Sequence, residues 1–251
     1  MSRDAIGRGH GIFKAIAVIF IAAACLAEES PAFADPSERK LADTLVRLLG
    51  EKFAPESLEV TVAGGRAYAE MRGVVLSGIR IDAMKLDALL VDAGRVEAAD
   101  VSSLASLIGY SRGELVLLER DVNAYFDSND TRGFSNLAFD FSNGGFRANG
   151  IFTASFLFTF RIRLAASGRL ALRANGVDLD GVAIYVENIE QPASLTDKIL
   201  SRVNPLIKWD SIPFRVAFKD IFMDDVSAVM TGYPERIESG ETAAWEEGVV
   251  R

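Results

Sequence analysis

The sequence predicts an α+β fold: a long, strongly curved antiparallel sheet wrapped around two or three helices, forming an elongated single domain with an apolar groove. Two observations lead to this prediction. Apolar residues recur at helical spacing in three short segments, and most of the remaining chain alternates apolar and polar residues with a period of two. The elements follow in the order helix, strands, short helix, long strands, helix, strands, which is typical of α+β proteins.

The first predicted helix begins after Asp35, a candidate N-cap, with Pro36 at the first helical position. Its apolar residues are Leu41, Leu45, Leu48 and Leu49. Gly50 marks its predicted end. From residue 58 to 91 the chain changes to short, glycine-punctuated segments with partial alternation, which predict three or four antiparallel strands.

Residues 101–109 fit a short helix or a turn, and a second helix is predicted from residue 119, where Val122, Tyr125 and Phe126 share one face. A strand from residue 136 then reaches Asn143-Gly144, a strong hairpin signal.

The segment IFTASFLFTFRIRL, residues 151–164, is interpreted as one strand with an aromatic face. Alternate positions carry Phe152, Ala154, Phe156, Phe158, Phe160, Ile162 and Leu164. Its 14 residues, at about 3.3 Å each, span roughly 46 Å. The same parity continues in Leu170 and Leu172, which predicts a three-residue hairpin loop at residues 166–168. That loop would place Leu164 opposite Leu170 and Ile162 opposite Leu172.

Three further features complete the predicted fold. Residues 177–186 form a strand, and a third helix opens with the capping pattern Ser194-x-x-Asp197 and ends at Pro205. Two more strands lie within residues 212–232, and residues 236–251 form an acidic flexible tail.

Residues 1–34 have the pattern of a cleaved export signal: a basic start, a 13-residue apolar run and PAFA before Asp35. The run is shorter than the roughly 20 residues that a membrane-spanning helix needs. Lipidation at Cys25 is an alternative. In both cases we expect an exported protein of the periplasm or cell envelope, with a lipid-binding domain over residues 35–235.

The net charge of −8 argues against a nucleic-acid partner. His10 and Cys25 are the only His and Cys of the chain, and both lie in the predicted signal. The remaining chain therefore offers no Ser-His-Asp triad, cysteine nucleophile or usual zinc site, and we expect neither an enzyme nor a cofactor. The pairs Asp178/Asp180 and Asp224/Asp225 lack calcium-loop spacing and are interpreted as turns.

The aromatic face has two interpretations. It is either an ordinary core or the lining of an elongated groove for an acyl chain. In the second case, the candidate lipid-binding residues are Phe152, Phe156, Phe158, Phe160, Ile162, Leu164, Leu170 and Leu172 on the sheet, with Leu45, Leu48, Leu49, Val122, Tyr125 and Phe126 as a helical wall.

The opposite face of the same strands carries Arg147, Arg161, Arg163, Arg169 and Arg173. The predicted register places Arg161 opposite Arg173, which is unfavourable without an anion nearby. Acidic residues on a neighbouring strand would neutralise the arginines. Otherwise, we expect Arg161, Arg163, Arg169 and Arg173 to dock anionic headgroups or a partner.

Several segments together resemble the LmeA-like phospholipid-binding family of exported bacterial proteins: LADTLVRLLGEKF, ELVLLERDVNAYF, VDLDGVAIYV and NPLIKWDSIPFRVAFKDIFMDD. The resemblance covers residues 41–231. It implies a tubular lipid-binding type of fold, in which a helix lies in a curved sheet and lipid tails fill the space between them. It implies no catalytic residues.

The sequence thus favours an envelope protein that binds phospholipid acyl chains and acts in lipid carriage, sensing or envelope maintenance, with peripheral contact to a membrane surface. The alternative is a non-enzymatic interaction protein with a filled core that docks a partner through its arginine face. A third hypothesis is an enzyme that acts on glycolipid through Asp178 or Asp180.

Overall fold

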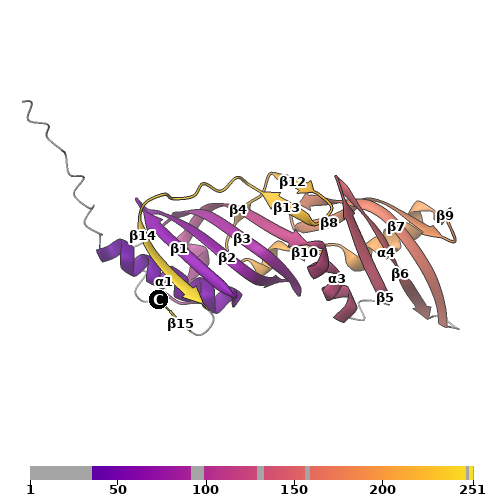
Figure 1. Ribbon diagram of the computed structural model, residues 1–251, viewed down its shortest axis with the longest axis horizontal. Helices are drawn as coiled ribbons and strands as arrows, with labels where there is room; N and C mark the ends of the chain where they lie inside the picture. Colours follow the sequence, from indigo (N-terminus) through magenta and orange to yellow (C-terminus); the bar gives the residue numbers. More distant parts are fainter. Residues whose placement is uncertain (1–35, 92–98, 129–132, 156–158, 247–248, 251) are drawn as a thin grey trace, which may run out of the picture. The chain divides into compact units, whose positions relative to one another are not determined.

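The computed structural model describes residues 36–91, 99–128, 133–155, 159–246 and 249–250. The predicted export signal, with His10 and Cys25, lies outside the described residues. Within them the chain folds into antiparallel sheets and four α-helices, which confirms the α+β class. The sheets are curved and open (Figure 1).

The helices are α1 (Pro36–Phe53), α2 (Leu104–Leu107), α3 (Glu119–Ser128) and α4 (Ala193–Val203), with 3-10 turns η2 (Val101–Ser103) and η3 (Trp209–Ser211). The strands are β1 (Ser57–Ala63), β2 (Arg66–Leu76), β3 (Ile79–Leu90), β4 (Ile108–Leu118), β5 (Phe134–Ser142), β6 (Gly145–Ser155), β7 (Thr159–Arg173), β8 (Gly176–Val186), β9 (Ile189–Glu190), β10 (Ile207–Lys208), β11 (Val216–Ala217), β12 (Asp220–Met223), β13 (Ser227–Thr231), β14 (Glu241–Glu246) and β15 (Val249–Val250).

The strands divide into two sheets rather than the single long sheet that we expected. Sheet A has the order β12-β13-β4-β3-β2-β1-β14-β15, and β11 pairs with β4 in parallel. Sheet B has the order β10-β8-β7-β6-β5, and β9 pairs with β8. The main hydrophobic core contains residues from both sheets.

Helix α1 packs on sheet A beside β1 and β14 (Figure 1). Its predicted end at Gly50 is wrong, because the helix continues to Phe53. A Cβ added to Gly50 would lie 3.8 Å from the Trp245 ring, so Gly50 is a packing position under β14. Trp245 and the buried Ala243 also show that residues 241–246 are not a loose tail, since they pair with β1 along its length.

The segment 151–164 is not one strand. Strand β6 ends at Ser155 and β7 begins at Thr159. The two strands are antiparallel partners, with Ser155 paired to Thr159 and Phe152 paired to Ile162. The predicted loop at 166–168 is also wrong, because β7 continues through it with an irregularity between Ser167 and Arg169. A three-residue loop keeps the apolar residues on even-numbered positions, whether it lies between Ser155 and Thr159 or at residues 166–168. The alternation alone therefore could not locate the chain reversal.

The predicted hairpin at Asn143-Gly144 is confirmed, with Ser142 paired to Gly145 and φ of +78° at Gly144. Side chains of α3 then cover the edge strand β5. The Asn123 amide accepts a hydrogen bond from Phe139 N (2.6 Å) and donates one to Phe139 O (2.9 Å). Helix α3 also contacts β3, so it joins the two sheets.

Candidate apolar site between α4 and sheet B

A small cavity of about 50 Å³ lies between α4 and the face of sheet B that α4 covers. All of its lining residues are apolar: Phe134, Leu137, Phe139, Phe146, Ala148, Gly150, Leu164, Ala166, Leu179, Val182, Ile184, Ile199, Leu200 and Val203. The described residues therefore offer the cavity hydrocarbon contacts and no charged group.

The sequence produces this lining through two periodicities. On β8, Val182 and Ile184 are two residues apart and point to one face of the sheet. On α4, Ile199 and Val203 are four residues apart and share one helical face. The two apolar faces meet at the cavity.

Helix α4 is attached firmly at one end. After its last residue, the Asn204 side chain accepts from Leu179 N and donates to Leu179 O, both at 2.9 Å. At the other end, Pro192 is the N-cap and gives no side-chain hydrogen bond, so the predicted Ser194 cap is wrong. Ser194 lies inside the helix, because α4 begins at Ala193.

Few side chains hold α4 against the sheet. Thr196 and Ile199 are its buried residues, while Leu200 and Val203 are half-buried. The Arg202 guanidinium lies 5.4 Å from the centre of the Phe152 ring. The helix is therefore a thin cover over the apolar face.

The predicted aromatic residues are dispersed around this cavity. Leu164 lines it, and Phe152 packs beside it with its ring centroid 5.0 Å from that of Phe134. Ile162 is half-buried opposite Phe152. Phe156 and Phe158, and the side chain of Phe160, lie outside the described residues.

The other predicted lipid-binding residues lie elsewhere. Leu170 and Leu172 pair with Leu179 and Val177 on β8 and belong to the main core, not opposite Leu164 and Ile162. Leu45, Leu48, Leu49 and Val122 are buried in the same core. Tyr125 and Phe126 border a neighbouring cavity of about 350 Å³, which shares Val203 with the apolar cavity and is also lined by residues of the 205–211 segment. Helix α4, rather than α1 or α3, supplies the helical wall of the apolar cavity.

Sequence reasoning missed Phe134, Ile184, Ile199 and Val203, which the structure places at the cavity. Their signal was present. The spacing of Ile199 and Val203 marks an apolar helical face, and Val182 and Ile184 occupy alternate positions of a predicted strand. The reversal at 155–159 brings these elements together, and the one-strand interpretation hid it.

The arginine face is partly neutralised. Asp180 accepts from Arg169 at 2.8 Å and from Arg173 at 2.6 Å, and the Arg169 hydrogen bond holds the pKa of Asp180 below its ordinary value. The interpretation of Asp178 and Asp180 as turn residues is wrong, because both lie within strand β8.

The predicted register of the arginines is wrong: Arg161 pairs with Thr153, and Arg163 pairs with Ile151. Both arginines are exposed, as is Arg147, and the ion pairs of the described residues involve none of the three.

The Asp224 prediction is confirmed. Its Oδ1 accepts from Val226 N (2.9 Å) and Ser227 N (2.7 Å) in the β12–β13 turn.

The part of the chain that the structure describes contains no group of three or more His, Cys, Asp or Glu side chains that could hold a metal ion. None of its helices is both long enough and apolar enough to cross a membrane. Comparisons with known protein families, curated proteins and solved structures gave no match.

Proposed function

We propose that this chain is an exported envelope protein that binds a phospholipid acyl chain between α4 and sheet B, acting in lipid carriage, sensing or envelope maintenance. The wholly apolar lining of the cavity is the observation that carries the proposal. Each CH₂ group moved there from water contributes about 0.8 kcal/mol. Export rests on the signal pattern of residues 1–34, and the resemblance to LmeA-like proteins stays a prediction that agrees with this role.

The size of the cavity sets a condition on binding. Ligand pockets occupy about 300–1,000 Å³, and this cavity occupies about 50 Å³. An acyl chain therefore enters only when α4 moves away from the sheet. The Pro192 end of α4 has no side-chain cap and is held to β8 by the hydrogen bond from Gln191 N to Ile184 O (2.8 Å), whereas Asn204 makes two hydrogen bonds at the other end. We therefore expect the Pro192 end to move first, which would open the predicted apolar groove.

The test is native mass spectrometry of residues 35–251, purified from the envelope without detergent, followed by organic extraction. We expect discrete adducts with phospholipid masses. Ile199→Asp places a charge in the lining and should remove them, whereas Ser194→Asp on the exposed face of α4 should keep them. Ala166→Leu fills the cavity with an apolar group and tests uptake without burying a charge.

A bare mass for the wild-type protein, together with no uptake from phospholipid vesicles, would contradict lipid binding. Unchanged uptake by both Ile199→Asp and Ala166→Leu would contradict the site. Circular dichroism of each variant shows that the fold is kept.

The exposed arginines favour a second candidate function, an envelope interaction protein. Arg161 and Arg163 lie on the outer face of sheet B, away from α4, and an acidic partner surface would complement them. Cross-linking in the envelope should give one specific adduct that Arg161→Glu with Arg163→Glu abolishes. Retention of the adduct in that variant would reject this candidate.

A further inference from the structure

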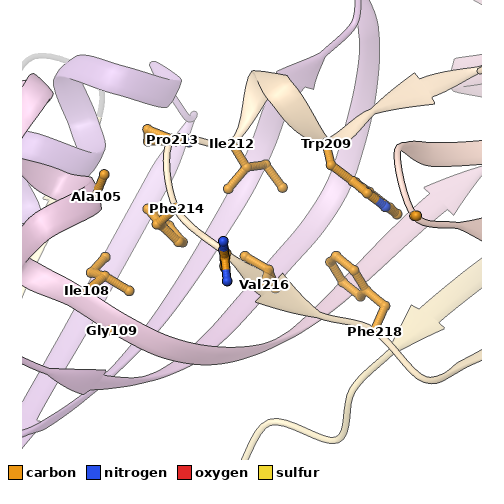
Figure 2. A pocket seen from close by; sticks show the side chains of 11 residues that line it. Ala105, Ile108, Gly109, Trp209, Ile212, Pro213, Phe214, Val216 and Phe218 are labelled. Carbon is orange, nitrogen blue, oxygen red and sulfur yellow. The ribbon is translucent and has the colours of Figure 1, made fainter.

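A larger cavity of about 750 Å³ lies between β4, α2 and the segment 209–218 (Figure 2). It is lined by Ala105, Ile108, Gly109, Ala174, Trp209, Ile212, Pro213, Phe214, Arg215, Val216 and Phe218. It shares no lining residue with the apolar cavity under α4. Its volume falls within the range of about 300–1,000 Å³ that is usual for small-molecule sites.

The cavity forms where β11 separates from β4. The two strands pair only at Val216 with Ser111 and Ala217 with Arg112, and Ser111 Oγ donates to Arg215 O at 2.8 Å. Gly113 permits this close approach, since a Cβ there would lie 2.9 Å from the Phe218 ring. Before Arg215 the segment leaves β4, and the gap between them is the cavity.

Aromatic side chains form firm walls. The Trp209 and Phe218 rings are stacked, with centroids 4.8 Å apart and planes at 23°. The Trp209 Nε1 group donates to Arg173 O at 3.0 Å, which fixes the indole ring. Figure 2 shows Ile108 and Phe214 at the opposite end from Trp209 and Phe218, so apolar surface borders both ends.

Among the described residues that line the cavity, Arg215 is the one that carries a charge. It is exposed, and the ion pairs of the described residues do not include it. A positive group at an apolar cavity, in a chain of net charge −8, selects against cationic ligands and for anionic ones.

We propose that this cavity binds a single-chain anionic amphiphile, with its hydrocarbon against Trp209, Phe214 and Phe218 and its carboxylate or phosphate on Arg215. The inference does not rest on phospholipid binding under α4, because the two cavities are separate. A carboxylate identifies a fatty acid as the ligand class, and a phosphate identifies an alkyl phosphate or a lysophospholipid headgroup.

Tryptophan emission reports on this site directly. The chain contains two tryptophans, and Trp245→Phe leaves Trp209 as the only one. The Trp245→Phe protein is titrated with dodecanoate, dodecyl phosphate, dodecanol and dodecyltrimethylammonium, each below its micelle concentration. We expect saturable changes with the anions and affinity at least about tenfold weaker for the neutral and cationic probes, as for the loss of one charge-assisted hydrogen bond.

Two variants locate the site. Arg215→Gln should weaken anion binding about tenfold, whereas Arg147→Gln, a matched exposed arginine on β6, should leave it unchanged. Ala105→Phe narrows the cavity and should reduce the affinity for every probe. Ile199→Asp, which blocks the α4 site, should leave dodecanoate binding intact, so failure of either proposal is visible separately.

Equal affinity for anionic and neutral probes, or an Arg215→Gln protein with wild-type affinity, would overturn the anion assignment. Absence of saturable binding by any probe, or full binding by Ala105→Phe, would overturn the site. Preference for dodecanoate over dodecyl phosphate assigns the ligand to fatty acids, and the reverse preference assigns it to phosphate headgroups.

Discussion

Helices α1 and α4 each cover the apolar face of a sheet, but they are buried to very different extents. Helix α1 buries Leu41, Ala42, Leu45, Val46, Leu48, Leu49 and Phe53 against sheet A. Helix α4 buries only Thr196 and Ile199 against sheet B. The same kind of amphipathic pattern thus builds a filled core in one region and a thin cover in the other.

The two sheets differ in the same way in their ion pairs. In sheet A, Asp87 accepts from both Arg66 and Arg112, and 3% of its side chain is exposed. In sheet B, Asp180 accepts from Arg169 and Arg173 with 25% exposed. Each aspartate joins two arginines, but only the carboxylate of sheet A is shielded from water. We infer that the ion pairs of sheet A contribute more to stability than those of sheet B.

The largest expected effect comes from the helices. Leu48→Ala removes a fully buried side chain and should lower the free energy of unfolding by about 2–5 kcal/mol. Leu200→Ala, the same substitution at a half-buried position of α4, should cost about 1 kcal/mol. Urea unfolding of both variants measures the difference, and equal losses would show that α4 is as firmly packed as α1.

The Asp87 network should give the next largest effect. Asp87→Asn leaves Arg66 and Arg112 without their buried carboxylate, and the loss of these hydrogen bonds should cost about 1–3 kcal/mol. The same urea measurement checks it. An unchanged midpoint would mean that water solvates both arginines as well as Asp87 does.

These differences explain what the sequence could predict. Periodicity located α1, α3, α4 and most strands, because side-chain spacing is a local property. It could not tell that residues 156–158 separate two paired strands or that β7 continues through residues 166–168. Those choices depend on which strand β7 pairs with, and long-range pairing decides them. The α4 site was missed for the same reason, since its wall is defined only once β8 lies beside β7.

The pH dependence of stability should follow Asp87. Burial alone would raise the pKa of Asp87, but hydrogen bonds from Arg66, Arg112 and the Glu235 backbone N–H hold it below the ordinary value. The unfolded chain has a pKa of about 3.9 at this residue. The stabilisation is therefore complete above that pH and is lost as the pH falls through the lower pKa of the folded state. Asp87→Asn should flatten the decrease in the unfolding free energy below about pH 4, and a decrease as steep as that of the wild type would assign it to other groups.

The smallest effect should come from Asp180→Asn. Arg169 and Arg173 are 66% and 48% exposed, so water replaces most of what the carboxylate provides. The expected loss is below about 1 kcal/mol, and 1 M NaCl should reduce it further by screening. Urea unfolding of Asp180→Asn and Asp87→Asn at low and high salt gives the contrast. A loss in Asp180→Asn that matches the loss in Asp87→Asn and persists in salt would mean that sheet B depends on its ion pairs as strongly as sheet A does.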